Sequence, residues 1–211
     1  MFDIEYRGGN SIVISTKGLK LVSDPKLSLL GLKDLNVKDM VELATESRFL
    51  TGTLDSRLSI EGPGEYEVGD FSIRGIRAIR HIDSDSVGFG STLYRIAVGD
   101  IRIALIGNIV SNLTEDQLEE IGVVDILIIP VGGAGYTLDS VGAAKLVRQV
   151  DPKVIIPIHY ADSSLVYEVP QDPLKLFTDE ISAPIEIVDK YKLKSAASLP
   201  PVMTIVEIKR I

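Results

Sequence analysis

The spacing of the apolar residues changes once along this chain, near Asn108. Before that point, short segments alternate apolar and polar side chains, as Phe2, Ile4 and Tyr6 do, which predicts half-buried antiparallel strands. After it, apolar runs of strand length alternate with segments that carry helix signals. Mixed strands followed by alternating helices and strands favour stacked sheets covered by helices over an all-parallel nucleotide-binding sheet.

The expected strands of the first half are short and joined by tight turns. They lie at Phe2 to Tyr6, Ile12 to Ile14, Leu19 to Ser23, Phe71 to Ile76, Thr92 to Val98 and Ile101 to Ile106. The last two are separated by Gly99-Asp100, a two-residue connection that is typical of hairpins. The first half is therefore predicted to be rich in β-structure.

The second half carries start and stop signals for three helices. Thr114 and Gln117 form a capping box at the start of one helix, and Gly122 is its expected C-terminal stop. Asp172-Pro173 provides an N-cap followed by proline at the first position of another helix. The expected helices are one after Thr114, one from about Asp139 to Val150 and one from Pro173 to about Ile181. The expected strands are Ile126 to Val131, Val154 to Ile158, Ile185 to Val188 and Val202 to Lys209.

Composition excludes several classes of protein. The 211 residues, 45% of them hydrophobic, suit one domain over residues 1–211. There is no cysteine, so disulfides and cysteine-bound metals are excluded, and a metal site would need His, Asp or Glu. The net charge of −8 opposes nucleic-acid binding. No apolar run reaches the length of a membrane span and the N-terminus is acidic, so we expect a cytoplasmic protein without a membrane partner.

Two further patterns predict ordinary loops. The glycine-rich run from Gly132 to Gly135 lacks the ending of a phosphate-binding loop and the dinucleotide spacing, so we interpret it as a turn after a buried strand. The stretch from Asp83 to Gly88 has two carboxylates at EF-hand-like offsets, but Val87 and Tyr94 stand where further ligands are needed. We expect a solvated loop there.

Four segments together resemble the metallo-β-lactamase superfamily, in particular its predicted Zn-dependent hydrolases related to the ascorbate-phosphate lactonases. They are Val22-Ser23-Asp24-Pro25, Ala104-Leu105-Ile106-Gly107-Asn108, the segment from Asp125 to Gly133, and Pro152 to Tyr160 with its Pro157-Ile158-His159-Tyr160. Their order and spacing match over nearly the whole chain. The resemblance implies a four-layer αββα sandwich with a site at one edge, in loops that follow the strands.

The metal-binding motif of this family is altered here. Members carry Thr-His-x-His-x-Asp-His at a strand end, and the corresponding stretch is Thr45 to Thr51. On that alignment Glu46 and Arg48 replace the first two histidines, Leu50 the aspartate and Thr51 the third histidine. Glu46 can still bind a metal, whereas the permanent positive charge of Arg48 repels one.

The other family positions that bind metal keep few of their usual ligands. Asn108 stands where the bridging aspartate is expected, while His81 and His159, the chain's only histidines, match two metal histidines that serve different metals. Neither metal then keeps the three protein ligands that a catalytic zinc usually has. Each histidine, Asn108 and Asp24 also has a structural alternative, as a hydrogen-bonded packing residue or a turn opener.

Two functions follow from these residues. The leading interpretation is a pseudohydrolase with no resident metal, in which Asp24, Glu46, Arg48 and Arg80 line the former metal pocket and a small anionic molecule or a protein partner binds. The alternative is a hydrolase that holds one zinc or manganese ion at His81, Asn108 and His159 and activates water for attack on an ester, lactone or phosphoester. A structural role in a homo-oligomer is a third possibility.

Overall fold

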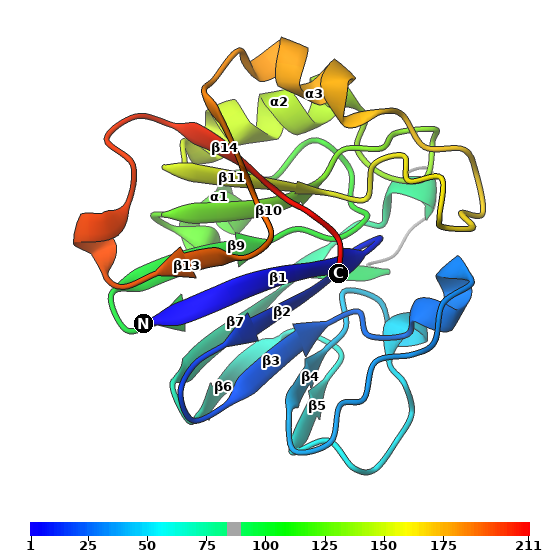
Figure 1. Cartoon of the computed structure of the whole chain (residues 1–211), viewed down its shortest axis with the longest axis vertical. Coiled ribbons are helices and arrows are strands. Elements are labelled where there is room, and N and C mark those ends of the chain that lie inside the picture. Colours follow the sequence, from blue (N-terminus) through cyan, green and yellow to red (C-terminus); the bar gives the residue numbers. More distant parts are fainter. Residues whose placement is uncertain (84–89) are drawn as a thin grey trace.

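Two β-sheets stack face to face in the computed structural model, which describes residues 1–83 and 90–211 (Figure 1). The first sheet has six strands in the described residues, in the order β13-β1-β2-β3-β4-β5. Its strands are β1 (Phe2–Gly8), β2 (Ser11–Ser15), β3 (Lys20–Ser23), β4 (Val41–Leu43), β5 (Leu58–Ile60) and β13 (Tyr191–Leu193). β3, β4 and β5 run parallel, so their C-terminal ends lie at one edge of the sheet.

The second sheet has eight strands in the same ranges, in the order β12-β14-β11-β10-β9-β8-β7-β6. They are β6 (Gly64–Val68), β7 (Phe71–Ala78), β8 (Ser91–Val98), β9 (Ile101–Leu105), β10 (Ile126–Pro130), β11 (Val154–Ile158), β12 (Ile185–Val188) and β14 (Thr204–Ile208). The strands from β6 to β9 pair antiparallel, whereas β9, β10, β11 and β14 pair parallel. This change of pairing follows the change of apolar spacing in the sequence.

The α-helices of the described residues cover the outer face of the eight-stranded sheet. They are α1 (Glu115–Ile121), α2 (Ser140–Val150) and α3 (Leu174–Ile181), and Figure 1 shows α2 and α3 side by side above the strands. Leu146 of α2 and Phe177 of α3 are fully buried in one cluster with Ile155 of β11. Short 3-10 helices at Leu27–Leu30, Ser47–Phe49, His81–Asp83 and Ala196–Ser198 complete the helical elements.

Every residue of β10 is buried, because both faces of its sheet are covered. Ile126 and Ile128 belong to the core between the two sheets, whereas Leu127 and Ile129 belong to the core under the helices. Alternate residues of a strand point to opposite faces, so a strand with two covered faces needs a continuous apolar run. The unbroken run in the sequence is thereby explained.

The outer face of the six-stranded sheet is covered by the segment after β3. Val13 and Val22 of this sheet are buried with Val37, and Leu35 and Met40 pack against them. The 3-10 helix Leu27–Leu30 belongs to the same connection. The predicted sandwich of stacked sheets with outer covering layers is thus confirmed.

The expected strands and helices are present, with boundaries that differ by one or two residues. The third helix has Pro173 as its N-cap in place of Asp172, and Leu174 is its first residue. The backbone of Asp172 is held elsewhere, since its N–H donates to Gly132 and its carbonyl accepts from Ala161. The capping box of Thr114 and Gln117 is formed as predicted.

Four short strands were not predicted from the sequence, and one predicted loop lies largely outside the described residues. The strands are β4, β5, β6 and β13. β6 has three glutamate and glycine positions among its five residues, a composition that carries little strand signal. The loop expected from Asp83 to Gly88 falls almost entirely in the range 84–89. In the two described ranges, none of the helices has the length and apolar character that a membrane span requires.

Candidate functional site

Segments that leave the C-terminal ends of four strands meet at one edge of the sandwich. Asp24 follows β3, Glu46 lies shortly after β4, Asn108 after β9 and His159 directly after β11. The β1–β2 turn adds Asn10, whose amide donates to Asn108 Oδ1 over 3.0 Å. All five side chains belong to buried residues, so the edge carries an enclosed polar cluster at the place where the resemblance predicted a site.

Asp24 fixes the end of β4. Its Oδ1 accepts from the Thr45 amide over 2.7 Å and its Oδ2 accepts from the Thr45 hydroxyl over 2.7 Å. Burial raises the pKa of Asp24 to about 7, although the hydrogen bonds from Thr45 act to lower it. Asp24 therefore holds the loop that follows β4 and does not act merely as a turn opener, and it also lines the cavity described below.

Glu46 is the centre of a network of charges. Its Oε2 accepts from Arg48 Nε over 2.9 Å and from Arg80 Nη1 over 3.2 Å. Its Oε1 accepts from Asn108 Nδ2 over 3.3 Å. The Glu46 side chain is 2% exposed, so the two guanidinium groups offset a desolvation penalty that an unpaired carboxylate could not bear.

Arg48 connects this network to Tyr136 and Glu168, which lie on later segments of the chain. Its Nη1 donates to Glu168 over 3.2 Å, its Nη2 donates to the Tyr136 hydroxyl, and its guanidinium lies 4.8 Å from the centre of the Phe49 ring. Arg48 and Arg80 thus both donate to Glu46, but Glu46 and the two arginines are not among the residues that line the cavity described below. The carboxylates of Glu46 and Glu168 already neutralise Arg48.

His159 closes the cluster from the end of β11. It has a left-handed backbone with φ of 53°, and its Nδ1 lies 3.0 Å from Gln171 Oε1. The ring is stacked on Tyr136 with centroids 5.6 Å apart and tilted against Tyr167 at 5.2 Å. Burial lowers the pKa of His159 to about 4, so the imidazole is neutral at physiological pH.

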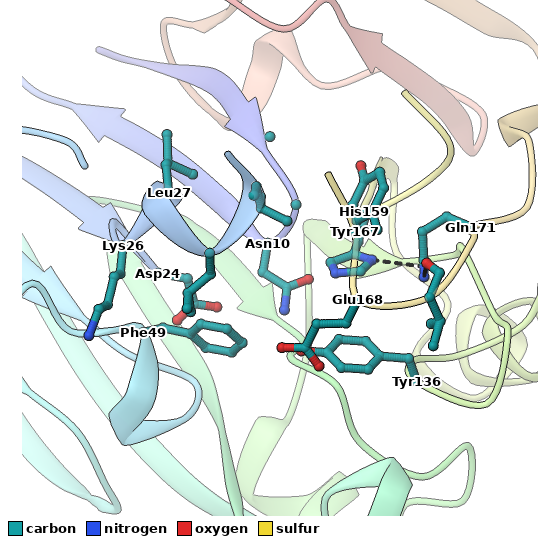
Figure 2. Close-up of a pocket in the computed structure, with 15 residues that line it drawn as sticks. Asn10, Asp24, Lys26, Leu27, Phe49, Tyr136, His159, Tyr167, Glu168 and Gln171 are labelled. Atoms are coloured by element: carbon teal, nitrogen blue, oxygen red, sulfur yellow. Dashed lines mark hydrogen bonds between the residues drawn. The ribbon is translucent and has the colours of Figure 1, made fainter. Parts of the chain in front are cut away.

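A cavity of about 30 Å³ lies beside His159, large enough for one or two groups of the size of water. Figure 2 shows Asn10, Asp24 and His159 around it, with the rings of Phe49 and Tyr136 in the lower part of the view. The lining also includes Phe49, Tyr136, Tyr167, Glu168, Gln171 and Lys26. Of the residues aligned with the family's metal ligands, His159 lines this cavity, whereas Glu46, Arg48 and Asn108 do not.

His81 is joined to Asn108 by a backbone hydrogen bond. Its amide donates to the Asn108 carbonyl over 2.9 Å, and its Nδ1 is buried and has no partner among the described residues. His81 is not among the residues that line the cavity beside His159. The structure thus places both histidines next to the polar cluster, but it does not bring them to one cavity.

The described residues do not fit a two-zinc centre. Residues 1–83 and 90–211 contain no group of three or more His, Asp or Glu side chains placed to hold a metal ion. Thr51, aligned with the family's third histidine, donates from its amide and hydroxyl to Glu42, over 2.7 and 2.8 Å. Both polar ends of the Asn108 amide are also engaged within the protein.

Several residues of this site carry no signal in the sequence. Asn10, Tyr136, Tyr167, Glu168 and Gln171 stand outside the four segments that resemble the family and outside the stretch from Thr45 to Thr51. The hydrogen bond between Asn10 and Asn108 joins residues 98 positions apart. Only the left-handed turn at Gly8 and Gly9 before Asn10 could have drawn attention to it.

The buried imidazole gives a testable pH dependence. The folded pKa of His159, about 4, lies below the 6.5 of an unfolded histidine, so its contribution to stability is present above pH 6.5 and is lost as pH falls towards 4. Between about pH 7 and 4.5 we expect wild type to lose roughly 2–3 kcal/mol more of its free energy of unfolding than His159→Gln.

Urea unfolding across this pH range, followed by circular dichroism, measures the difference. Asp24 has the opposite sign, because its folded pKa of about 7 lies above the 3.8 of an unfolded aspartate. Since Asp24 is present in both proteins, its contribution cancels in the comparison. A constant difference between the two proteins across the range would contradict the neutral, buried imidazole.

Comparison with known proteins assigns the family. The family model described as the beta-lactamase superfamily domain matches residues 3–159. A protein of Archaeoglobus fulgidus named UPF0173 metal-dependent hydrolase is 31% identical over 77 residues, which cover 36% of this chain and 33% of that protein. A protein of the same name from Carboxydothermus hydrogenoformans is 49% identical over 43 residues, 20% of this chain and 19% of its own. The matched segments therefore span about a third or less of these curated relatives.

Solved structures show the same fold over the whole chain. A crystal structure from Thermotoga maritima, assigned to the metallo-β-lactamase superfamily, superposes with a TM-score of 0.78 and 22% identity and covers 99% of both chains. Igni18, a metallo hydrolase from Ignicoccus hospitalis, superposes with a TM-score of 0.63 and 14% identity over 99% of this chain and 95% of its own. This chain has the metallo-β-lactamase fold and belongs to the beta-lactamase superfamily.

Proposed function

We propose that this protein is a non-catalytic member of the superfamily that binds a small molecule in the cavity beside His159. The observation that carries the proposal is the environment of Glu46. This carboxylate, at the position of a family metal ligand, accepts hydrogen bonds from Arg48, Arg80 and Asn108. The guanidinium groups of Arg48 and Arg80 neutralise the Glu46 charge that a metal ion would otherwise neutralise.

The electrostatics of the network disfavour a metal at the same place. Two guanidinium groups within 3.2 Å of one carboxylate oxygen repel a divalent cation, and they cannot lose their protons to make room for it. Displacing them would remove both guanidinium partners of the buried Glu46 carboxylate. A hydrolase mechanism that needs a metal-activated water therefore has little support in this network.

The cavity favours a neutral or cationic ligand over an anionic one. Asp24 and Glu168 line it, and the guanidinium of Arg48 is already paired with Glu46 and Glu168. The anionic ligand expected from the sequence depended on arginines that line the cavity, and Arg48 and Arg80 are not among its lining residues. The protein partner, the homo-oligomer and the cytoplasmic location stay predictions.

Metal content tests the proposal against the one-metal hydrolase. We expect protein loaded with zinc or manganese and then dialysed to retain far less than one equivalent, as measured by elemental mass spectrometry, because His159 and His81 do not share a ligand set. His159→Ala and His81→Ala should give the same low values as wild type. A metal-binding member of the superfamily, treated in parallel, shows that dialysis spares a true site.

Retention of about one equivalent by wild type, lost in His159→Ala, would overturn the proposal. In that case the site of His159 holds a metal, and hydrolysis of ester, lactone and phosphoester substrates becomes the function to measure. Loss of the metal in His81→Ala alone would identify His81, and not His159, as its ligand. Either result separates the hydrolase from the binding protein.

A further inference from the structure

The orientation of two buried amides follows from Glu46. Its carboxylate can only accept, so Asn108 turns its Nδ2 towards Glu46 and its Oδ1 towards Asn10. Asn10 must then donate from Nδ2, which leaves its Oδ1 as the remaining acceptor. Asn10 is 5% exposed, and this oxygen is buried without a hydrogen-bond partner in the described residues. We call this chain of hydrogen bonds from Glu46 through Asn108 to Asn10 a relay. It ends at Asn10 Oδ1, an acceptor without a hydrogen bond on a residue that lines the cavity.

A second relay fixes the tautomer of His159. Gln171 Nε2 donates to the Val169 carbonyl over 2.9 Å, so Gln171 Oε1 faces the imidazole and accepts from Nδ1. The proton of the neutral ring is therefore on Nδ1, and Nε2 carries a lone pair. Figure 2 shows this second nitrogen on the side of the ring that faces Asn10. The two relays present two acceptors to the same cavity.

Among the described residues, no group donates a hydrogen bond to Asn10 Oδ1. The Tyr167 hydroxyl donates to the Tyr160 carbonyl over 2.7 Å. The Tyr136 hydroxyl accepts from Arg48 and keeps one O–H to donate. Lys26 lines the cavity, but Figure 2 shows its amine pointing away from Asn10. Asp24 and Glu168 add carboxylates to the lining, so a donor from outside meets several acceptors there.

We propose that the cavity binds a primary ammonium group. Such a group donates three hydrogen bonds, which suits Asn10 Oδ1, His159 Nε2 and a carboxylate. It is small enough for a volume of about 30 Å³, and the rings of Phe49, Tyr136 and Tyr167 suit a cation. The inference rests on the proposed function, because a metal ion on His159 would take the same lone pair.

The two histidines of the chain make a direct test possible. Protein labelled with ¹⁵N-histidine gives ring-nitrogen signals from only His81 and His159. At about pH 7, we expect ammonium and methylammonium chloride to shift the His159 Nε2 signal saturably, as its lone pair accepts a hydrogen bond. For a ligand of one or two heavy atoms, a dissociation constant on the order of 10 mM is expected. His81 Nδ1 serves as the internal control.

Matched salts at constant ionic strength decide what is recognised. Potassium has a similar size but no N–H, and tetramethylammonium has charge but no donor and exceeds the cavity. Neither should shift His159 Nε2. An equal response to potassium, or no saturable response to methylammonium, would overturn the inference and leave water as the occupant of the cavity.

A variant pair locates the response. Asn10→Leu removes the acceptor and should weaken methylammonium binding at least about tenfold, whereas Asn112→Leu, an exposed asparagine outside the cavity lining, should bind as wild type does. If Asn10→Leu does not fold, the comparison of salts in wild type decides alone. Chelator treatment before the titration removes bound metal, so the ammonium response is measured on metal-free protein. The separate metal-retention experiment tests the proposed function independently of this response.

Discussion

Replacing Arg48 and Arg80 together by leucine is expected to lower the free energy of unfolding by about 3–5 kcal/mol. The double variant leaves the Glu46 carboxylate buried, with the Asn108 amide as its remaining hydrogen-bond donor among the described residues. Removing the partners of a buried charge costs far more than removing an exposed ion pair, because the remaining charge keeps its desolvation penalty. For a chain of this length the midpoint of thermal unfolding should fall by roughly 10 °C.

A third substitution separates charge from packing. Adding Glu46→Gln to the double variant removes the unpaired charge, keeps the shape of the side chain and keeps an oxygen for Asn108. It should therefore regain most of the lost stability. Urea unfolding of wild type, the double and the triple variant measures both steps.

Arg74→Leu is the matched control for this experiment. Arg74 pairs with Glu65 and Glu120, and its side chain is 43% exposed. Its loss should cost about 1 kcal/mol or less. If the double variant of Arg48 and Arg80 is no less stable than this control, the arginines do not carry the buried charge, and the basis of the proposed function is lost.

Gly132→Ala is expected to cost about 4 kcal/mol or more and to displace His159. A Cβ at position 132 would lie 2.1 Å from the His159 carbonyl oxygen and 2.3 Å from Gln171 Oε1. The first of these atoms belongs to the backbone at the end of β11, which cannot move without breaking the pairing of β10 and β11. The relay from Gln171 to His159 should be lost with it.

Gly62→Ala provides the control, because its Cβ would meet nothing within 4 Å. Its stability should stay close to that of wild type. The His159 ring-nitrogen signals of both variants report on the relay independently of stability. Equal stability of the two variants, with unchanged His159 signals, would contradict the close approach of Gly132 to the end of β11.

Local patterns in the sequence determined much of the fold. The capping box at Thr114, the hairpin at Gly99-Asp100 and the apolar run of β10 each depend on residues a few positions apart, and the structure forms all three. These signals are reliable because backbone geometry and capping act over one or two turns. The N-cap of α3 shifted to Pro173, because Gly132 and Ala161, far along the chain, hold the backbone of Asp172.

The sequence alone also determined that the metal ligands of the family are largely replaced, since no alignment can supply histidines that the chain lacks. Only the tertiary structure decided what takes their place. The pairing of Arg80 with Glu46 and the relay from Glu46 through Asn108 to Asn10 join segments from different strands. Such contacts depend on which strand ends meet at the edge of the sandwich, and no short-range spacing in the sequence encodes that meeting.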